Sequence, residues 1–333
     1  MKRFFRREFL SLCFFSLLLN SCNEQQKEKQ QDDTADESQC PVDCGPHGTC
    51  AEPGSGMACV CDEGYKGATC NISPDDSNGE QDDSVDCTRE FAGPVLFIGN
   101  SFTSSNSLPE MVAGFAEESG CPIEYEASIP GGYKFSDHVS DSSTQDLIRS
   151  REWNSAVLQN QSQMPGFKPE DVITGTLPDA QALADLLMKD GRDPRLVYFL
   201  TWGYRDGDVN NCDYYDQVCT FEGHTRALHE GYTIYADETG GEISPAGLAW
   251  ADVRADEDAP FNYEDMWSGD GRHPALSGSY LAAAVLYYTL SGNSPAGLDY
   301  TGGLSTELAD YLQKMAAHTV ENYQDKSRNN SGP

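Results

Sequence analysis

The segment VLFIGNSFT, residues 95–103, decides the fold of this 333-residue chain. Its first four residues are apolar and predict a buried strand, which Gly99 ends. Ser101 lies on the turn that follows. The chain then enters a helix predicted over 107–119, where apolar residues recur at helical spacing and Pro109 falls in the first turn. A strand that leads through a short turn into a helix is the repeating unit of α/β domains.

The same alternation continues along the chain. Short apolar runs predict further strands at 123–129, 156–159, 196–201 and 243–250. Helical patterns predict helices at 178–190, 220–240, 277–291 and 304–323, and we expect a disordered tail at 324–333. The order predicts one α/β domain over residues 91–323, with three α/β/α layers around a parallel five-stranded sheet. Ligands of such sheets bind at the carboxyl ends of the strands, where Ser101 falls.

Residues 1–21 have the pattern of an export signal. Basic residues precede an apolar run at 9–19 that is too short to span a bilayer comfortably. The sequence LNSC at 19–22 resembles a bacterial lipobox, which implies lipidation of Cys22; an ordinary signal peptide is the alternative. The sequence RREFL at 6–10 resembles a twin-arginine motif, so both export routes stay open. We expect an exported protein of the bacterial cell envelope, lipid-anchored at the outer membrane or the cell surface.

Two polar, acidic stretches flank a cysteine-rich segment. Residues 22–39 are predicted to be a disordered tether and residues 71–90 a linker, because neither has the apolar content to offset the entropy of ordering. Between them, six cysteines follow the spacing C-x3-C-x5-C-x8-C-x-C-x8-C over residues 40–70. Disulfides are favoured over a zinc site there, because the export signal points to an oxidising compartment.

This spacing, with Gly64, Tyr65 and Gly67 before the last cysteine, resembles an EGF-like domain. The resemblance implies the disulfides Cys40–Cys50, Cys44–Cys59 and Cys61–Cys70, whereas the spacing alone leaves the pairing open. We predict no calcium site, and expect the module to act as a spacer or to contact a protein or glycan.

Four more cysteines lie in or next to the large domain. Cys212 and Cys219 are close together in a loop rich in tyrosine and aspartate and are predicted to form a disulfide. Cys87 and Cys121 are then predicted to form the other.

Two segments carry candidate chemistry. Ser101 follows a strand at a helix start, a place that exposes a hydroxyl next to free backbone N–H groups; the alternative is that it only caps the helix. In Asp270-Gly-Arg-His273-Pro, one turn can bring the carboxylate against the imidazole, which fixes the tautomer of a general base. The alternative for that segment is a solvated loop.

Together these segments are similar to the SGNH (GDSL-like) hydrolase superfamily over nearly all of residues 91–323, as a divergent bacterial branch. The resemblance implies a flavodoxin-like fold with Ser101 as nucleophile, His273 as general base and Asp270 as its partner. It also implies that the N–H of Ser101 serves the oxyanion hole. The chain has Gly-Asn-Ser at 99–101 in place of the superfamily's Gly-Asp-Ser.

The other oxyanion donors follow from the same resemblance. Gly131 or Gly132 matches the superfamily's second glycine. The Asn of its Gly-x-Asn-Asp turn has no literal match. Gln161 falls where that Asn would stand, with Asn160 beside it, and either amide could donate to an oxyanion.

The segment TWGYRDGD, residues 201–208, ends the fourth predicted strand at the same edge. Trp202, Tyr204 and Arg205 could bind a sugar by stacking and hydrogen bonds; the alternative is a tryptophan of the core. The formal net charge of −32 argues against nucleic acid as a partner. No cluster has metal-ligand spacing, so neither a metal nor a cofactor is expected.

These patterns predict a metal-independent serine esterase that acts outside the cytoplasm. The expected substrate is an acylated carbohydrate, most simply an acetylated one, or another small ester. A non-catalytic surface protein that binds glycan or protein is the main alternative. A lipase or thioesterase with the same triad is another, although the sequence has no long apolar lid.

Overall fold

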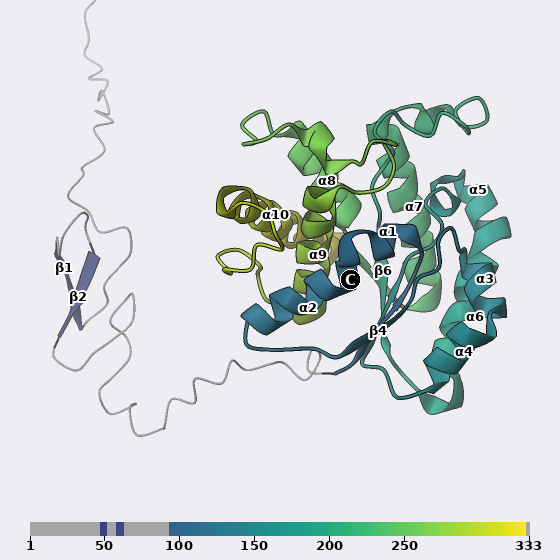
Figure 1. The fold of residues 1–333 in the computed structure, drawn as a ribbon, viewed down its shortest axis with the longest axis horizontal. Helices are drawn as coiled ribbons and strands as arrows, with labels where there is room; N and C mark the ends of the chain where they lie inside the picture. The colour runs from purple at the N-terminus through teal and green to yellow at the C-terminus, as the bar shows by residue number, and fades with distance from the viewer. Residues whose placement is uncertain (1–46, 52–57, 63–92, 331–333) are drawn as a thin grey trace, which may run out of the picture. The chain divides into compact units, whose positions relative to one another are not determined.

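The structure is a computed structural model that describes residues 47–51, 58–62 and 93–330 (Figure 1). The chain forms two compact units, residues 1–81 and 82–333. In the first unit, strands β1 (Gly48–Ala51) and β2 (Ala58–Cys61) pair antiparallel, with Cys50 opposite Cys59. Cys61 is disulfide-bonded. The three predicted pairings involve Cys40, Cys44 and Cys70, which lie outside the described residues, and so they stay predictions.

The second unit is built on a five-stranded sheet whose neighbouring strands are all parallel. The strands are β3 (Val95–Ile98), β4 (Tyr125–Ser128), β5 (Ser155–Leu158), β6 (Arg195–Phe199) and β7 (Glu242–Ser244). Their order across the sheet is β4-β3-β5-β6-β7. This is the flavodoxin-like order, in which the chain reverses its direction of winding between the first and third strands, here β3 and β5. The predicted fold class is confirmed.

Helices cover both faces of the sheet (Figure 1). One face carries α2 (Leu108–Glu118), α8 (Ala246–Ala255), α9 (Leu276–Ser291) and α10 (Thr306–Asn330). The other carries α3 (Phe135–Ser140), α4 (Ser142–Arg149), α6 (Leu177–Met188) and α7 (Phe221–Thr239). Two short helices, α1 (Ser101–Ser104) and α5 (Pro169–Asp171), lie in the connections after β3 and β5.

The apolar run of strand β3 does not alternate with polar residues, because the strand is buried on both faces. Val95 and Phe97 pack into the core beneath α2 and α9, whereas Leu96 and Ile98 pack into the core beneath α6 and α7. All four side chains are at most 1% exposed. A central parallel strand is buried on both faces, and so both sets of side chains must be apolar.

Two predicted segments differ from the structure. The strand predicted at 243–250 ends at Ser244, and residues 246–250 belong to helix α8. Pro245 cannot donate to the sheet, and a short buried apolar run does not by its pattern distinguish a helix from a strand. The disordered tail predicted from residue 324 is wrong as far as Asn330, because α10 continues to that residue. Adding a residue to an existing helix needs no new nucleation.

The predicted disulfide between Cys212 and Cys219 is present, with 4.8 Å between the two Cα atoms. Cys121 is disulfide-bonded as well. Its predicted partner Cys87 lies outside the described residues. Along the described parts of the chain, the helices are either too short or too polar to span a bilayer.

Candidate active site

Ser101 is the first residue of α1, and two residues, Gly99 and Asn100, separate it from strand β3. The helix is capped by its neighbour Asn100, whose side-chain oxygen accepts the Phe102 N–H at 3.1 Å. The same side chain donates to the Tyr133 carbonyl oxygen at 2.9 Å. Asn100 is therefore the N-cap residue of α1, and the interpretation of Ser101 as no more than a helix cap is wrong. An amide can perform both tasks, since it donates and accepts.

The hydroxyl of Ser101 contacts a histidine from the far end of the chain. Ser101 Oγ lies 2.8 Å from His273 Nε2, and His273 Nδ1 lies 2.6 Å from Asp270 Oδ2. The structure thus joins the three residues in one hydrogen-bonded chain, as the sequence predicts. Because Nδ1 faces a carboxylate, the neutral imidazole carries its proton there and presents an acceptor nitrogen to the serine.

Asp270 is held by several donors at once. Its Oδ1 accepts the backbone N–H groups of Arg272 (2.9 Å) and His273 (3.0 Å) and the hydroxyl of Ser268 (2.9 Å). Desolvation alone would raise the pKa of Asp270, but these bonds and the one from the His273 ring stabilise the anion. Together they hold the pKa well below its ordinary value of 3.8. The carboxylate is therefore ionised at neutral pH.

An aromatic stack lies behind the histidine. The Phe102 ring lies 5.3 Å from the ring of His273 and stacks on Trp202 at 5.2 Å between centroids. Trp202 in turn stacks on Trp250 at 4.0 Å, and its Nε1–H donates to the Arg272 carbonyl oxygen at 3.0 Å. The stack restricts the positions of the His273 ring and of the loop that carries it.

These contacts correct the predicted sugar-binding site. Trp202 is 0% exposed and Tyr204 is 4% exposed, so neither ring can stack on a sugar. Trp202 is the core residue of the alternative interpretation. The hydroxyl of Tyr204 contacts that of Ser162 at 2.6 Å, which links the loops after β6 and β5. Of the three predicted residues, only Arg205 exposes a substantial part of its side chain, 34%.

The predicted oxyanion donors start from equivalent positions on three adjacent strands. Ile98 is paired in register with Ser128 on one side and with Leu158 on the other. Ser101, Gly131 and Gln161 each follow their strand's paired residue by three positions. Parallel strands end at one edge, so the three loops begin side by side at the point where the winding reverses.

Two of these positions offer free backbone donors. Within residues 93–330, the N–H groups of Ser101 and Gly131 donate to no protein acceptor. Gly131 and Gly132 are exposed, with no atom within 4 Å of where a side chain would start. Gly132 has a φ of +76°, a conformation that favours glycine. This open turn leaves room for a substrate against the backbone.

The two candidate oxyanion amides, Asn160 and Gln161, differ in whether their side-chain N–H groups are already engaged. The side-chain oxygen of Asn160 accepts the N–H groups of Phe135 (3.1 Å) and Gln161 (2.8 Å), and its nitrogen donates to the Tyr235 hydroxyl. Asn160 is 1% exposed, so its assignment as an oxyanion donor is wrong. Gln161 is partly exposed, and the one contact of its Nε2, to Gln163, is 3.5 Å long. Gln161 is the amide that remains available.

Sequence reasoning missed Gln159 as a residue of the nucleophile turn. Its side chain is 0% exposed, and its Oε1 accepts the Asn100 N–H at 3.0 Å and the Thr103 hydroxyl at 2.9 Å. Gly99 is required at this point, because a Cβ there would lie 2.5 Å from Thr103 Oγ1. The amide-rich string QNQSQ signals polar contacts, but which amide faces β3 depends on how the strands pair.

His138 was missed as well, since no sequence pattern marks it. It is 0% exposed, and its Nε2 lies 2.9 Å from the carbonyl oxygen of Gly99, while Nδ1 lies 3.2 Å from Thr144 Oγ1. Burial lowers the pKa of His138, although the bond to Gly99 opposes the shift. The neutral ring therefore donates from Nε2 and holds the backbone just before Asn100.

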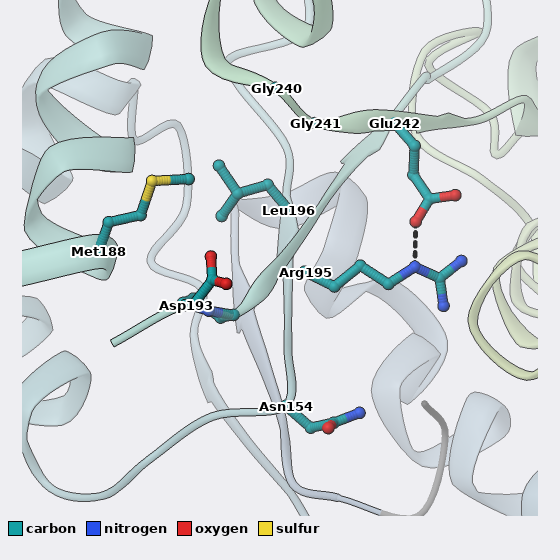
Figure 2. Close-up of a pocket in the computed structure, with 9 residues that line it drawn as sticks. Asn154, Met188, Asp193, Arg195, Leu196, Gly240, Gly241 and Glu242 are labelled. Atoms are coloured by element: carbon teal, nitrogen blue, oxygen red, sulfur yellow. Dashed lines mark hydrogen bonds and ion pairs between the residues drawn. The ribbon is translucent and has the colours of Figure 1, made fainter. Parts of the chain in front are cut away.

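A cavity of about 380 Å³ lies at the opposite edge of the sheet, at the amino ends of the strands (Figure 2). Its lining includes Asn154, Arg195 and Glu242, which stand at the amino ends of β5, β6 and β7. Figure 2 shows the ion pair between Arg195 and Glu242. The guanidinium also donates to the carbonyl oxygens of Leu290 and Thr289 at the end of α9. Its donors are engaged in holding the fold, so this cavity is not the candidate active site.

Both units of the chain are similar to known proteins. Residues 40–73 match the family model of a Teneurin-like EGF domain, as the cysteine spacing predicts. No curated protein matches the chain significantly. A solved structure of a DUF4886 family protein from Bacteroides uniformis is 21% identical, with a TM-score of 0.56, and the match covers 70% of this chain and 95% of that one. This likeness shows a shared fold.

Two further solved structures are similar to the chain. One is described as a putative SGNH hydrolase from Slackia heliotrinireducens, with 25% identity, a TM-score of 0.47, and coverage of 59% of this chain and 97% of that one. The other is described as a putative GDSL-like lipase from Parabacteroides merdae, with 16% identity, a TM-score of 0.44, and coverage of 62% and 98%.

Proposed function

We propose that the large unit is a serine esterase that uses Ser101, His273 and Asp270 through an acyl-enzyme. The observation that carries the proposal is the hydrogen-bonded chain from Ser101 Oγ through the His273 ring to Asp270, with links of 2.8 and 2.6 Å. A structural role alone would not require a partly exposed serine to meet the acceptor nitrogen of an imidazole whose other nitrogen faces a carboxylate.

In the first half of the reaction, Ser101 Oγ attacks the acyl carbon while its proton passes to His273 Nε2. The negative charge on the tetrahedral oxygen is held by the N–H groups of Ser101 and Gly131 and by the Gln161 amide. The ester bond to the leaving oxygen then breaks, and that oxygen takes the proton from His273. The alcohol departs and Ser101 keeps the acyl group.

Water completes the cycle. His273 takes one proton from water as its oxygen attacks the acyl carbon, and the bond to Ser101 Oγ breaks as the proton returns to the serine. The free acid leaves. Asp270 stays ionised throughout and stabilises the imidazolium, which is consistent with its lowered pKa. None of these steps is assigned to a metal.

A fluorophosphonate probe tests the proposal directly. It should label Ser101 covalently, as mapped by peptide mass spectrometry, and the labelled protein should no longer hydrolyse a short-chain aryl acetate. His273→Ala should label far more slowly, because the serine loses its base. A wild-type protein that neither labels at Ser101 nor hydrolyses any ester offered would favour the non-catalytic binding protein instead.

We propose an acetylated carbohydrate as substrate and the bacterial cell envelope as location. The open Gly131–Gly132 turn leaves space for a bulky alcohol such as a sugar. The lipobox-like sequence at 19–22 supports export and anchoring through Cys22. Release of acetate from acetylated sugars tests the substrate. Detergent partitioning of wild type and Cys22→Ala tests the anchor, which is contradicted if the variant still partitions into detergent.

A further inference from the structure

Arg272 stands inside the proposed catalytic loop, between Asp270 and His273. Its backbone is fixed at both ends, because its N–H donates to Asp270 Oδ1 at 2.9 Å and its carbonyl oxygen accepts the Trp202 indole N–H at 3.0 Å. The starting point of the side chain is therefore as well defined as that of His273. A charged group carried here has a fixed position relative to the reacting serine.

The guanidinium of Arg272 lies against the ring of Tyr204, with 5.0 Å from its central carbon to the ring centroid. Tyr204 is itself held by the hydrogen bond to Ser162, the residue after Gln161. The side chain of Arg272 thus reaches from the catalytic loop toward the loop after β5, which carries the available amide. Stacking on an aromatic face leaves the N–H groups at the edge of the guanidinium free to donate.

Arg272 has no acidic partner among residues 93–330, whereas most described arginines have one. The ion-paired arginines are Arg149, Arg151, Arg195, Arg205 and Arg254. The nearest carboxylate in sequence, Asp270, is engaged by His273, Ser268 and the loop backbone. In a chain with 54 acidic residues, an unpaired guanidinium beside the proposed general base stands out.

A second guanidinium lies on the same loop. Arg205 Nη2 is 3.4 Å from the point where a Cβ on Gly271 would stand, and the Arg205 N–H donates to the Gly271 carbonyl oxygen at 2.9 Å. The partner of Arg205 is its exposed neighbour Asp206 at 3.2 Å, a pair of little strength in water. Two guanidinium groups therefore lie at residues 271 and 272, next to the anionic Asp270, whose oxygens are engaged by the loop itself.

Salt screens the distant acidic surface more strongly than it screens a guanidinium in contact with the substrate. At physiological salt the Debye length is about 8 Å, so the distant acidic surface is largely screened from a bound substrate, while a guanidinium in contact is not. A net charge of −32 would otherwise repel an anion. An anionic group near the scissile ester would contact the planar guanidinium of Arg272, which can bind a carboxylate through two parallel hydrogen bonds.

We propose that the preferred ester carries a carboxylate close to the scissile bond, and that Arg272 binds it. The inference rests on the proposed esterase function and names its substrate class. The carboxylate can belong to the alcohol part, as in an acetylated sugar acid, or to the acyl part, as in the half ester of a dicarboxylic acid. Both present the same anion to Arg272.

Matched substrate pairs test the inference and separate its two sources. The first pair is acetylated methyl glucuronoside and acetylated methyl glucoside, which differ in a carboxylate on the alcohol part. The second is the para-nitrophenyl half ester of adipic acid and para-nitrophenyl hexanoate, which differ on the acyl part. In at least one pair, wild-type kcat/KM should favour the anionic member by about tenfold or more, the worth of a charge-assisted bidentate contact.

Three variants decide whether Arg272 is responsible. Arg272→Gln should bring the ratio of the two kcat/KM values close to one, and Arg272→Lys, which keeps the charge without the fork, should retain part of the preference. Arg226→Gln, a change at an exposed arginine of α7, should keep the wild-type ratio. Ratios near one for wild type in both pairs, or a ratio unchanged in Arg272→Gln, would overturn the inference even if Ser101 is an active nucleophile.

Binding without turnover separates this inference from the esterase proposal. In Ser101→Ala, calorimetry should show the glucuronoside or the adipate half ester binding about tenfold or more tightly than its neutral partner, and Arg272→Gln should remove the difference. If wild type hydrolyses nothing but this difference is present, the esterase proposal fails and the anion site stands. Equal binding in both pairs overturns the anion site.

Discussion

The side-chain amide of Asn106 donates to the carbonyl oxygen of Pro274 at 3.2 Å. It also donates to the hydroxyl of Ser279 at 2.9 Å. The contact joins the segment that carries Ser101 to the loop that carries His273, across 168 positions of sequence. Asn106 has a φ of 54°, and Ser107 a φ of 55°, left-handed conformations that are rare outside glycine. Strained backbone of this kind is typical of functional sites.

We therefore expect Asn106 to set the distance between Ser101 and His273. Asn106→Gly keeps the left-handed backbone and removes both hydrogen bonds; it should lower kcat by about 10- to 100-fold with little change in KM, since a small misplacement of catalytic groups has effects of this size. Asn106→Ala should lose as much activity and more stability, because alanine disfavours this φ. If Asn106→Gly has wild-type kcat, the contact does not position the triad.

The triad itself should behave as one unit. Ser101→Ala and His273→Ala should each reduce turnover by about three or more orders of magnitude, and the double variant should lose little more than either alone. Asp270→Asn should lose less, because the misoriented imidazole retains some function. Robust hydrolysis by Ser101→Ala, measured with a short-chain aryl ester, would eliminate the serine mechanism. Chelators should leave the wild-type rate unchanged, and abolition of activity by a chelator would indicate a metal instead.

Asp270 should not titrate at the pH of an ordinary aspartate. Desolvation opposes the shift, but the hydrogen bonds to the carboxylate hold the pKa of Asp270 well below its ordinary value of 3.8. The carboxyl carbon of Asp270, followed by NMR in the folded protein, should therefore show no midpoint near 3.8 as the pH is lowered. A midpoint at or above 3.8 would contradict this assignment.

Substitution of Gln161 should affect catalysis, whereas substitution of Gln159 should affect stability. Gln161→Ala should raise the barrier by roughly 2–4 kcal/mol with an unchanged Tm, if the partly exposed amide donates to the oxyanion. Gln159→Ala should lower the Tm, because it leaves the buried Asn100 N–H and Thr103 hydroxyl without their acceptor. Kinetics and thermal melts of both variants check this contrast. Unchanged kinetics in Gln161→Ala would leave the two backbone N–H groups as the oxyanion donors.

Acid should destabilise the fold through buried histidines. Burial lowers the pKa of His224 from 6.5 to about 4, with Asp208 opposing, and its Nδ1 accepts the Tyr204 N–H at 3.1 Å. Because the folded pKa is depressed, the unfolded chain binds the proton first as the pH falls. Stability is then complete above pH 6.5 and is lost progressively towards pH 4, by roughly 3 kcal/mol for this one group.

Burial lowers the pKa values of His138 and His229 as well, so they add to the loss in the same direction. Denaturant unfolding between pH 4 and 7 measures the slope. His224→Gln should flatten it, whereas His318→Gln, a change at an exposed residue of α10, should not. The same slope in wild type and His224→Gln would contradict the assignment.

The sequence by itself determined the fold class, the order of the five strands and the two segments that meet at the site. Continuous apolar runs such as 95–98 are consistent with strands buried on both faces, and their alternation with helical patterns favours a parallel sheet. Asp270 and His273 are close in sequence, so their pairing depends on one local turn. The disulfide between Cys212 and Cys219 is local in the same sense.

Only the tertiary structure decided which polar side chains face the site. Gln159, Asn160 and Gln161 have similar chemistry, and their different roles follow from the register of β5 against β3 and from the tyrosines of α7 beneath them. The sequence likewise left Trp202 open between the surface and the core, because burial depends on which distant residues pack there; Phe102 and Trp250 do. Such choices are made by contacts between segments far apart in the chain, and a pattern of neighbouring residues carries no record of them.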